Sequence, residues 1–176
     1  MMVVHGHTHV PINARGAVIA IGNFDGVHRG HQALLKEAVN KAKALSKASA
    51  AMVFEPHPRE FFQPDEVHFR LTPLTAKLEL FEQLGLIVTF VEHFDQHLAG
   101  MTAREFIERV LVAGYGVAHV IIGYDFFFGH KRGGNPEVMI AAGEEMGFGV
   151  TIVPPVAEAG EVFASSSVRL HLAQGD

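Results

Sequence analysis

The sequence predicts a three-layer α/β/α domain in which helices cover both faces of a mainly parallel β-sheet. Short, nearly continuous apolar runs alternate with longer amphipathic segments along the chain. Apolar runs of this kind are typical of parallel strands buried on both faces, and the alternation with helices is typical of α/β domains. The predicted strands are Ala17–Ile21, Ala51–Phe54, Leu86–Val91, Val117–Ile122 and Gly149–Val153.

The predicted helices lie between these strands and carry their own boundary signals. In the first, apolar residues recur at three- and four-residue spacing from Leu34 to Leu45. Three others begin at a capping residue or a proline and end at a glycine, as helices commonly do. Their boundaries are Thr72–Pro73 to Gly85, Thr102–Glu105 to Gly114, and Asn135–Pro136 to Gly147.

Composition excludes several classes of protein. No apolar run approaches the roughly 20 residues that span a bilayer, and the N-terminus lacks a basic segment followed by a long apolar core, so we do not expect secretion. The chain has no cysteine, so it has neither disulfides nor thiolate metal sites, and we expect it to be cytoplasmic. Its net charge of −5 disfavours a general role in nucleic-acid binding. An anionic ligand must therefore be held by a local cluster of residues.

Four polar clusters follow predicted strands, and ligands of parallel sheets bind at the carboxyl ends of the strands. In the first cluster, residues 22–31, the glycines allow close approach to a ligand and the helix that follows offers N–H groups to phosphate. His28 and His31 are three residues apart, so both can face the same phosphate. The alternative is a glycine-rich turn with two incidental histidines. The other clusters are Glu55–Glu60, Gly123–Gly134 and Ser165–Arg169.

Each of these three clusters also has a purely structural interpretation. Two prolines bracket His57, which suits either a flavin-facing turn or a rigid connection between a strand and a helix. Residues 123–134 combine three phenylalanines with cations and glycines, which suits a mobile loop over a flat ring and its phosphate. We nevertheless expect one of these phenylalanines to belong to the core. Ser165, Ser166 and Arg169 either bind phosphate or simply cap a helix.

The stretch Gly22-Asn23-Phe24-Asp25-Gly26-Val27-His28-Arg29-Gly30-His31 resembles the HxGH signature of the nucleotidyltransferase superfamily, in the extended form of bacterial FAD synthetases. The resemblance extends through Phe54–Glu60, Arg70–Thr72, Gly123–Gly134 and Ala164–Arg169, and so covers the chain beyond its first fifteen residues. One departure is Ala164, where family members usually carry serine. The resemblance implies a Rossmann-like nucleotidyltransferase fold.

The resemblance also implies the reaction FMN + ATP → FAD + pyrophosphate, with FMN and ATP as small-molecule substrates and Mg²⁺ entering with ATP. The FMN phosphate is already ionised, so the enzyme must chiefly align the reactants and stabilise charge. The candidate catalytic residues are Asp25, His28, His31 and Arg169. The candidates for ATP or phosphate binding are Gly22, Asn23, Phe24, Gly30, Ser165 and Ser166. The candidates for flavin binding are Pro56, His57, Pro58, Asp125, Phe126, Phe128 and Arg132.

Two other functions remain open at this point. One is a sister HxGH adenylyltransferase that acts on another phosphate nucleophile, such as nicotinamide mononucleotide or phosphopantetheine. The other is a flavin- or nucleotide-binding module without catalysis. As to domains, we expect residues 1–15 to form an N-terminal extension, adventitious or disordered, and residues 16–176 to form the nucleotidyltransferase domain. The resemblance implies that a riboflavin kinase domain would begin where this chain stops.

Overall fold

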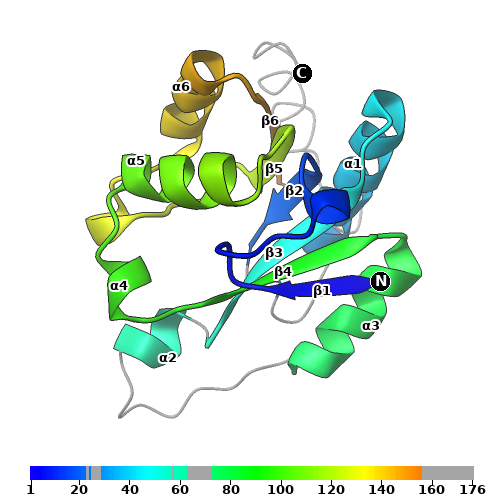
Figure 1. Cartoon of the computed structure of the whole chain (residues 1–176), viewed down its shortest axis with the longest axis horizontal. Coiled ribbons are helices and arrows are strands. Elements are labelled where there is room, and N and C mark those ends of the chain that lie inside the picture. Colours follow the sequence, from blue (N-terminus) through cyan, green and yellow to red (C-terminus); the bar gives the residue numbers. More distant parts are fainter. Residues whose placement is uncertain (23, 25–28, 57, 63–72, 156–176) are drawn as a thin grey trace.

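The computed structural model describes residues 1–22, 24, 29–56, 58–62 and 73–155. These residues contain a six-stranded sheet, whose arrangement with the helices is drawn in Figure 1. The strands are β1 (Met2–His5), β2 (Val18–Ile21), β3 (Ser49–Glu55), β4 (Val88–His93), β5 (His119–Gly123) and β6 (Gly149–Val153). Their order across the sheet is β1-β4-β3-β2-β5-β6, and every neighbouring pair is parallel. The predicted parallel sheet is confirmed, and all five predicted strands are present with small shifts of their ends.

Helices pack on both faces of this sheet. One face is covered by α1 (Arg29–Leu45) and α3 (Leu74–Leu84), and the other by α5 (Ala103–Glu105) with its π-helical continuation η2 (Phe106–Gly114) and by α6 (Pro136–Met146). Alternate residues of β2 point to opposite faces, as in any strand. Val18 and Ala20 pack with α1, whereas Ile19 and Ile21 belong to the core beneath η2. The predicted three-layer arrangement is confirmed.

Short elements complete the described part of the chain. They are η1 (Ile12–Ala14), α2 (Pro58–Phe62), α4 (Gln96–Ala99) and η3 (His130–Arg132). Within the described residues, no helix is long and apolar enough to cross a membrane.

The helix boundaries follow the predicted local signals. The Asn135 side chain caps α6 by accepting from the backbone N–H of Val138 at 2.9 Å, and α6 ends at Gly147 in the left-handed conformation. Helix α3 ends in the same way at Gly85, whose φ is 100°. Glycine adopts this conformation without the Cβ clash that other residues suffer, so these two stops are encoded locally.

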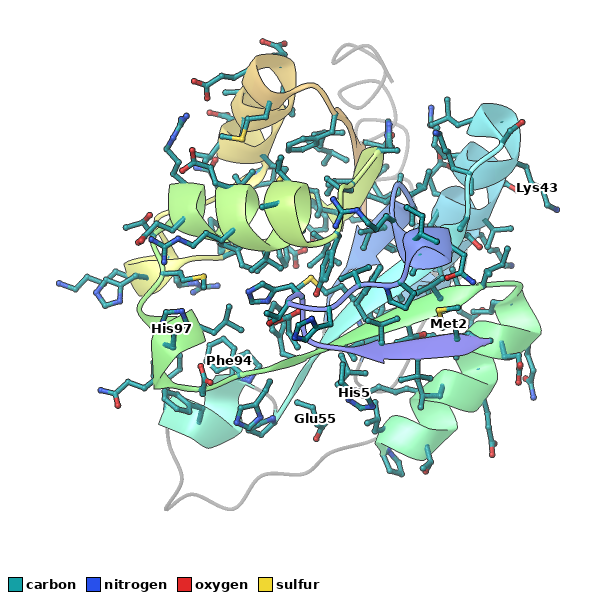
Figure 2. The ribbon with its side chains drawn as sticks, in the orientation of Figure 1. Met2, His5, Lys43, Glu55, Phe94 and His97 are labelled. Atoms are coloured by element: carbon teal, nitrogen blue, oxygen red, sulfur yellow. The ribbon has the colours of Figure 1, made fainter. Side chains whose placement is uncertain are left out.

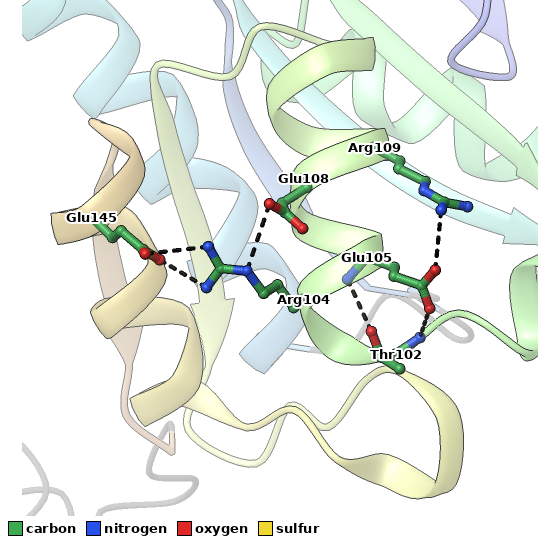
Figure 3. A network of polar contacts seen from close by, with 6 residues as sticks. All are labelled: Thr102, Arg104, Glu105, Glu108, Arg109 and Glu145. Carbon is green, nitrogen blue, oxygen red and sulfur yellow. Dashed lines mark hydrogen bonds and ion pairs between the residues drawn. The ribbon is translucent and has the colours of Figure 1, made fainter.

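The predicted capping box at Thr102 is also present (Figure 3). The backbone N–H of Glu105 donates to the Thr102 hydroxyl at 3.1 Å, and the Glu105 carboxyl group accepts from the Thr102 N–H at 3.0 Å. Arg104, in the same turn, forms two hydrogen bonds with Glu145 of α6, at 2.8 and 3.2 Å. Arg104 and Glu145 are both exposed, so their pair links α5 with α6 but contributes little to stability.

The N-terminal residues are ordered, and this corrects the expectation of an adventitious or disordered extension. Met2 and His5 mark the two ends of β1 (Figure 2), which pairs with β4 from Met2↔Val88 to His5↔Val91. Beyond β1, His7 Nδ1 lies 2.7 Å from the carboxyl group of Glu92, which is only 3% exposed. The prediction failed because β1 is only four residues long and has no strong local signal, while its place in the sheet comes from a partner far along the chain.

Candidate active site

The order of the strands reverses between β2 and β5, and this position defines the candidate active site. From β2 the chain proceeds through β3 to β4 on one side of the sheet, whereas β5 and β6 lie on the other. In open parallel sheets, the crevice at the carboxyl ends beside such a reversal binds ligands. Gly22 directly follows β2, and Gly123 ends β5, each two residues beyond the registered pair Ala20↔Ile121. The structure therefore places the beginnings of the first and third predicted clusters side by side.

Helix α1 begins at this edge of the sheet. Its first residues are Arg29, Gly30 and His31, so the three described residues of the HxGH stretch lie in the first turn. Backbone N–H groups in the first turn of a helix have no partner within the helix, and the helix dipole is positive there. The combination suits a phosphate group, which is the ligand predicted from the sequence.

Phe24 anchors the turn that connects β2 with α1. Its ring is 1% exposed and makes edge-on contacts with His31 and Phe81, each with centroids 5.5 Å apart. Gly22 lies against the same ring, since a Cβ there would be 3.2 Å from Phe24 Cζ. Phe24 was predicted to bind the nucleotide. Its ring is buried against His31, and its role in nucleotide binding stays a prediction.

Several predicted site residues lie outside the described residues. They are Asn23, Asp25 and His28 of the first cluster, His57 of the second, and Ser165, Ser166 and Arg169 of the fourth. Their roles stay predictions.

The second cluster follows β3. The bond between Glu55 and Pro56 is cis, and Pro58 is the first residue of α2. The N–H of Phe94 donates to the Glu55 carbonyl at 3.3 Å, and Figure 2 labels both residues. The ring of Phe94 also contacts Phe61 and Phe62 of α2, with centroids 5.5 and 5.8 Å apart. Aromatic packing thus anchors the turn that carries the predicted flavin-binding residues Pro56 and Pro58.

The three phenylalanines of residues 123–134 have different environments. Phe128 is 7% exposed and packs against Phe106 of η2, and Phe126 stacks on Phe128 with centroids 5.5 Å apart. The expectation that one of the three belongs to the core is met by Phe128. Phe127, in contrast, is 47% exposed, and the guanidinium of Arg132 lies over its ring at 4.7 Å.

Phe126 and Phe128 were predicted from the sequence to contact the flavin. The two most exposed aromatic residues of this loop, Phe127 and Tyr124, were not among the predicted residues. No pattern in a run of three phenylalanines separates these environments.

Among the described residues, no group of three His, Asp or Glu side chains could hold a metal ion. Asp125 is an exposed carboxylic acid whose Oδ1 would lie 3.2 Å from a Cβ on Gly123, so it folds back over the end of β5. A single carboxylate of this kind does not form a magnesium site by itself, since the ion prefers six oxygen ligands.

The parallel sheet, the glycine-containing turn after β2 and the helix that starts where the strand order reverses define an α/β nucleotidyltransferase-like fold. The chain belongs to the FAD synthetase family, whose pattern it matches over residues 10–167. It is 39% identical, over its whole length, to a bifunctional riboflavin kinase/FMN adenylyltransferase of Pseudomonas fluorescens. It is 37% identical, over 97% of its length, to the protein with the same description in Escherichia coli K12.

The chain spans about half the length of these relatives, 56% and 54% respectively. Among solved structures, it resembles one described as a macrolide-efflux protein from Streptococcus pneumoniae, with a TM-score of 0.77 and 20% identity. The match covers 97% of this chain and 55% of the other. At that identity the similarity concerns the fold alone.

Proposed function

We propose that this chain is an FMN adenylyltransferase, which transfers AMP from ATP to FMN and releases pyrophosphate. The observation that carries the proposal is the match to the FAD synthetase family across residues 10–167, which include β2 and β5, where the strand order reverses. In the reaction, an oxygen of the FMN phosphate bonds to the α-phosphorus of ATP. The bond from that phosphorus to the bridging oxygen breaks, and pyrophosphate leaves with the electron pair.

The start of α1 is suited to hold the phosphates of ATP. Backbone N–H groups at the start of a helix are suited to donate to phosphate oxygens, and Gly30 leaves room for the ligand. His31 lies on the same turn, held by the buried ring of Phe24, and donates to the transferred phosphate together with His28. Fixed donors of this kind stabilise the charge that develops in the transition state.

The other assignments follow the predicted clusters. Ser165, Ser166 and Arg169 hold the leaving pyrophosphate, because hydroxyl groups and a planar guanidinium suit its oxygens. Residues 56–58 and the loop of residues 123–134, including Asp125, Phe126, Phe128 and Arg132, contact the flavin nucleotide. Asn23 and Asp25 orient the phosphates.

We propose that Mg²⁺ enters with ATP, where it would neutralise phosphate charge. The net charge of −5 makes such a counter-ion useful for bringing two polyanions together. We further propose a cytoplasmic enzyme of small molecules that does not act on nucleic acid, in keeping with that charge and the absence of cysteine.

The test is pyrophosphate release by the purified chain with ATP and Mg²⁺, followed by chromatography for FAD. We expect release to require FMN and to match FAD formed. Pyrophosphate release with nicotinamide mononucleotide or phosphopantetheine in place of FMN would indicate the sister adenylyltransferase. Binding of FMN without release of pyrophosphate would indicate a non-catalytic module. Riboflavin with ATP should give no FMN, because the predicted clusters all belong to a single centre for attack on the α-phosphate.

A further inference from the structure

The loop of residues 123–134 carries an aromatic–cation pair at its tip. Phe127 leaves nearly half of its surface exposed, although it lies between two phenylalanines that pack inward. The guanidinium of Arg132 covers its ring, with Cζ 4.7 Å from the ring centroid. Both side chains are exposed, so this contact lies at the surface and not in the core.

The base of the loop is fixed without this pair. Phe128 and Gly134 exchange backbone hydrogen bonds of 3.2 and 2.8 Å, and the N–H of His130 donates to the Met101 carbonyl at 2.7 Å. Gly129 is seated against Ala103, since a Cβ there would be 2.7 Å from the Ala103 nitrogen. These contacts hold the base of the loop without Phe127, so the exposed ring is available to contact other groups.

The backbone turns Arg132 toward Phe127. Lys131 and Arg132 have φ values of 54° and 55°, a left-handed conformation that residues with a Cβ adopt rarely. Two such residues in succession reverse the chain after Gly129 and bring the Arg132 side chain to the ring. Within the described part of the chain, no carboxylate forms an ion pair with Arg132.

A guanidinium that stacks on a ring still has its donors available. Its five N–H bonds lie along the edges of the planar group, and a single ring on one side cannot occupy them all. Those edges match the oxygens of a phosphate, which arginine can bind with two parallel hydrogen bonds. Holding the side chain in one place also lowers the conformational entropy that is lost when the anion binds.

We propose that Phe127 is a positioning residue that presents Arg132 as a fixed cation to the phosphate of the flavin nucleotide. The proposal rests on the proposed function, and it deepens it by assigning recognition of the FMN phosphate, as opposed to the flavin ring, to this pair. FMN should thereby be preferred over riboflavin, which has the same ring and no phosphate.

The test is a double-mutant cycle read by flavin binding, so it does not depend on turnover. Phe127→Leu should weaken FMN binding about two- to fivefold, the usual strength of an exposed cation–π contact, and should leave riboflavin binding unchanged. Phe127→Tyr should retain FMN binding. In an Arg132→Gln background, Phe127→Leu should have no further effect. Tyr124→Leu, which removes another exposed aromatic residue of the loop, should show no such coupling with Arg132.

The outcomes separate this proposal from the proposed function. If wild-type protein binds FMN but releases no pyrophosphate, the transferase assignment fails while the cycle can still be completed. Additive effects of the two substitutions would overturn the proposal, as would an equal loss of FMN and riboflavin binding, which would make Phe127 a contact of the ring. No binding of FMN by wild-type protein would overturn it as well. Unchanged thermal unfolding of each variant excludes a folding defect.

Discussion

The hydroxyl group of Tyr115 offers a test of how much one buried hydrogen bond contributes to the stability of the domain. Tyr115 is fully buried, and its hydroxyl donates to the carboxyl group of Glu92, which is 3% exposed and also contacts His7. The Tyr115 ring stacks on Phe90, with centroids 4.0 Å apart. Tyr115→Phe removes the hydroxyl and keeps the stacked ring, so it isolates one hydrogen bond without opening a large cavity.

The expected loss of stability follows from burial. A buried acceptor that loses its donor costs about 1–3 kcal/mol. For a domain of this size each kcal/mol lowers Tm by about 2–4 °C, which gives a fall of about 2–12 °C. Burial raises the pKa of Tyr115, and the negative charge and hydrogen bond of Glu92 raise it further. Because the folded protein keeps this proton longer than the unfolded chain, wild-type stability should fall as the pH rises above the ordinary tyrosine value of about 10.

Urea unfolding at neutral and alkaline pH measures both effects. Tyr115→Phe should be less stable at neutral pH and should lack the tyrosine part of the alkaline decline. Tyr124→Phe is the matched control, because Tyr124 is 53% exposed and its change should stay within about 0.5 kcal/mol. If Tyr115→Phe were as stable as wild type, the buried hydrogen bond would not contribute the stability expected from its burial.

Four further predictions address stability and catalysis. Burial, with the nearby charge of Lys41, lowers the pKa of His119 to about 4. The free energy of unfolding should therefore fall as the pH is lowered from about 6.5 to 4, and His119→Gln should remove this pH dependence in acid unfolding curves. Asn135→Ala should cost about 1 kcal/mol in urea unfolding by removing the cap of α6, and no change would contradict the capping role. His31→Ala should lower kcat by about 10²–10³ and weaken FMN binding less, whereas the reverse pattern would remove it from the transition state. Arg169→Ala should raise KM for ATP more than KM for FMN, with partial rescue by Arg169→Lys.

The helix ends could be predicted because their causes are local. Asn135 and Thr102 cap their helices through their own side chains, and Gly85 and Gly147 end theirs through a conformation that glycine adopts freely. Strand ends were predicted less accurately, because they depend on which partner continues the ladder. Ser49, for example, begins β3 two residues before the predicted start, since it pairs with Val18.

Features that depend on distant partners could not be predicted. The order of β1 rests on β4, and His7 meets Glu92, which is 85 residues away. Within the candidate site, a general rule for parallel sheets placed Gly22 and Gly123 at one edge, but the burial of Phe24 depends on packing against Phe81 of α3. The difference in exposure between Phe127 and the neighbouring phenylalanines likewise depends on how the folded loop packs against the rest of the chain.

The central claim is that this chain joins FMN to the AMP part of ATP, and the most direct measurement is simultaneous assay of pyrophosphate and FAD. Purified protein is incubated with ATP, Mg²⁺ and FMN, with the double variant His28→Ala/His31→Ala as the control. The account predicts one pyrophosphate for each FAD, no release without FMN, and a loss of both products in the double variant. FMN-independent release of pyrophosphate, or a double variant as active as wild type, would contradict it.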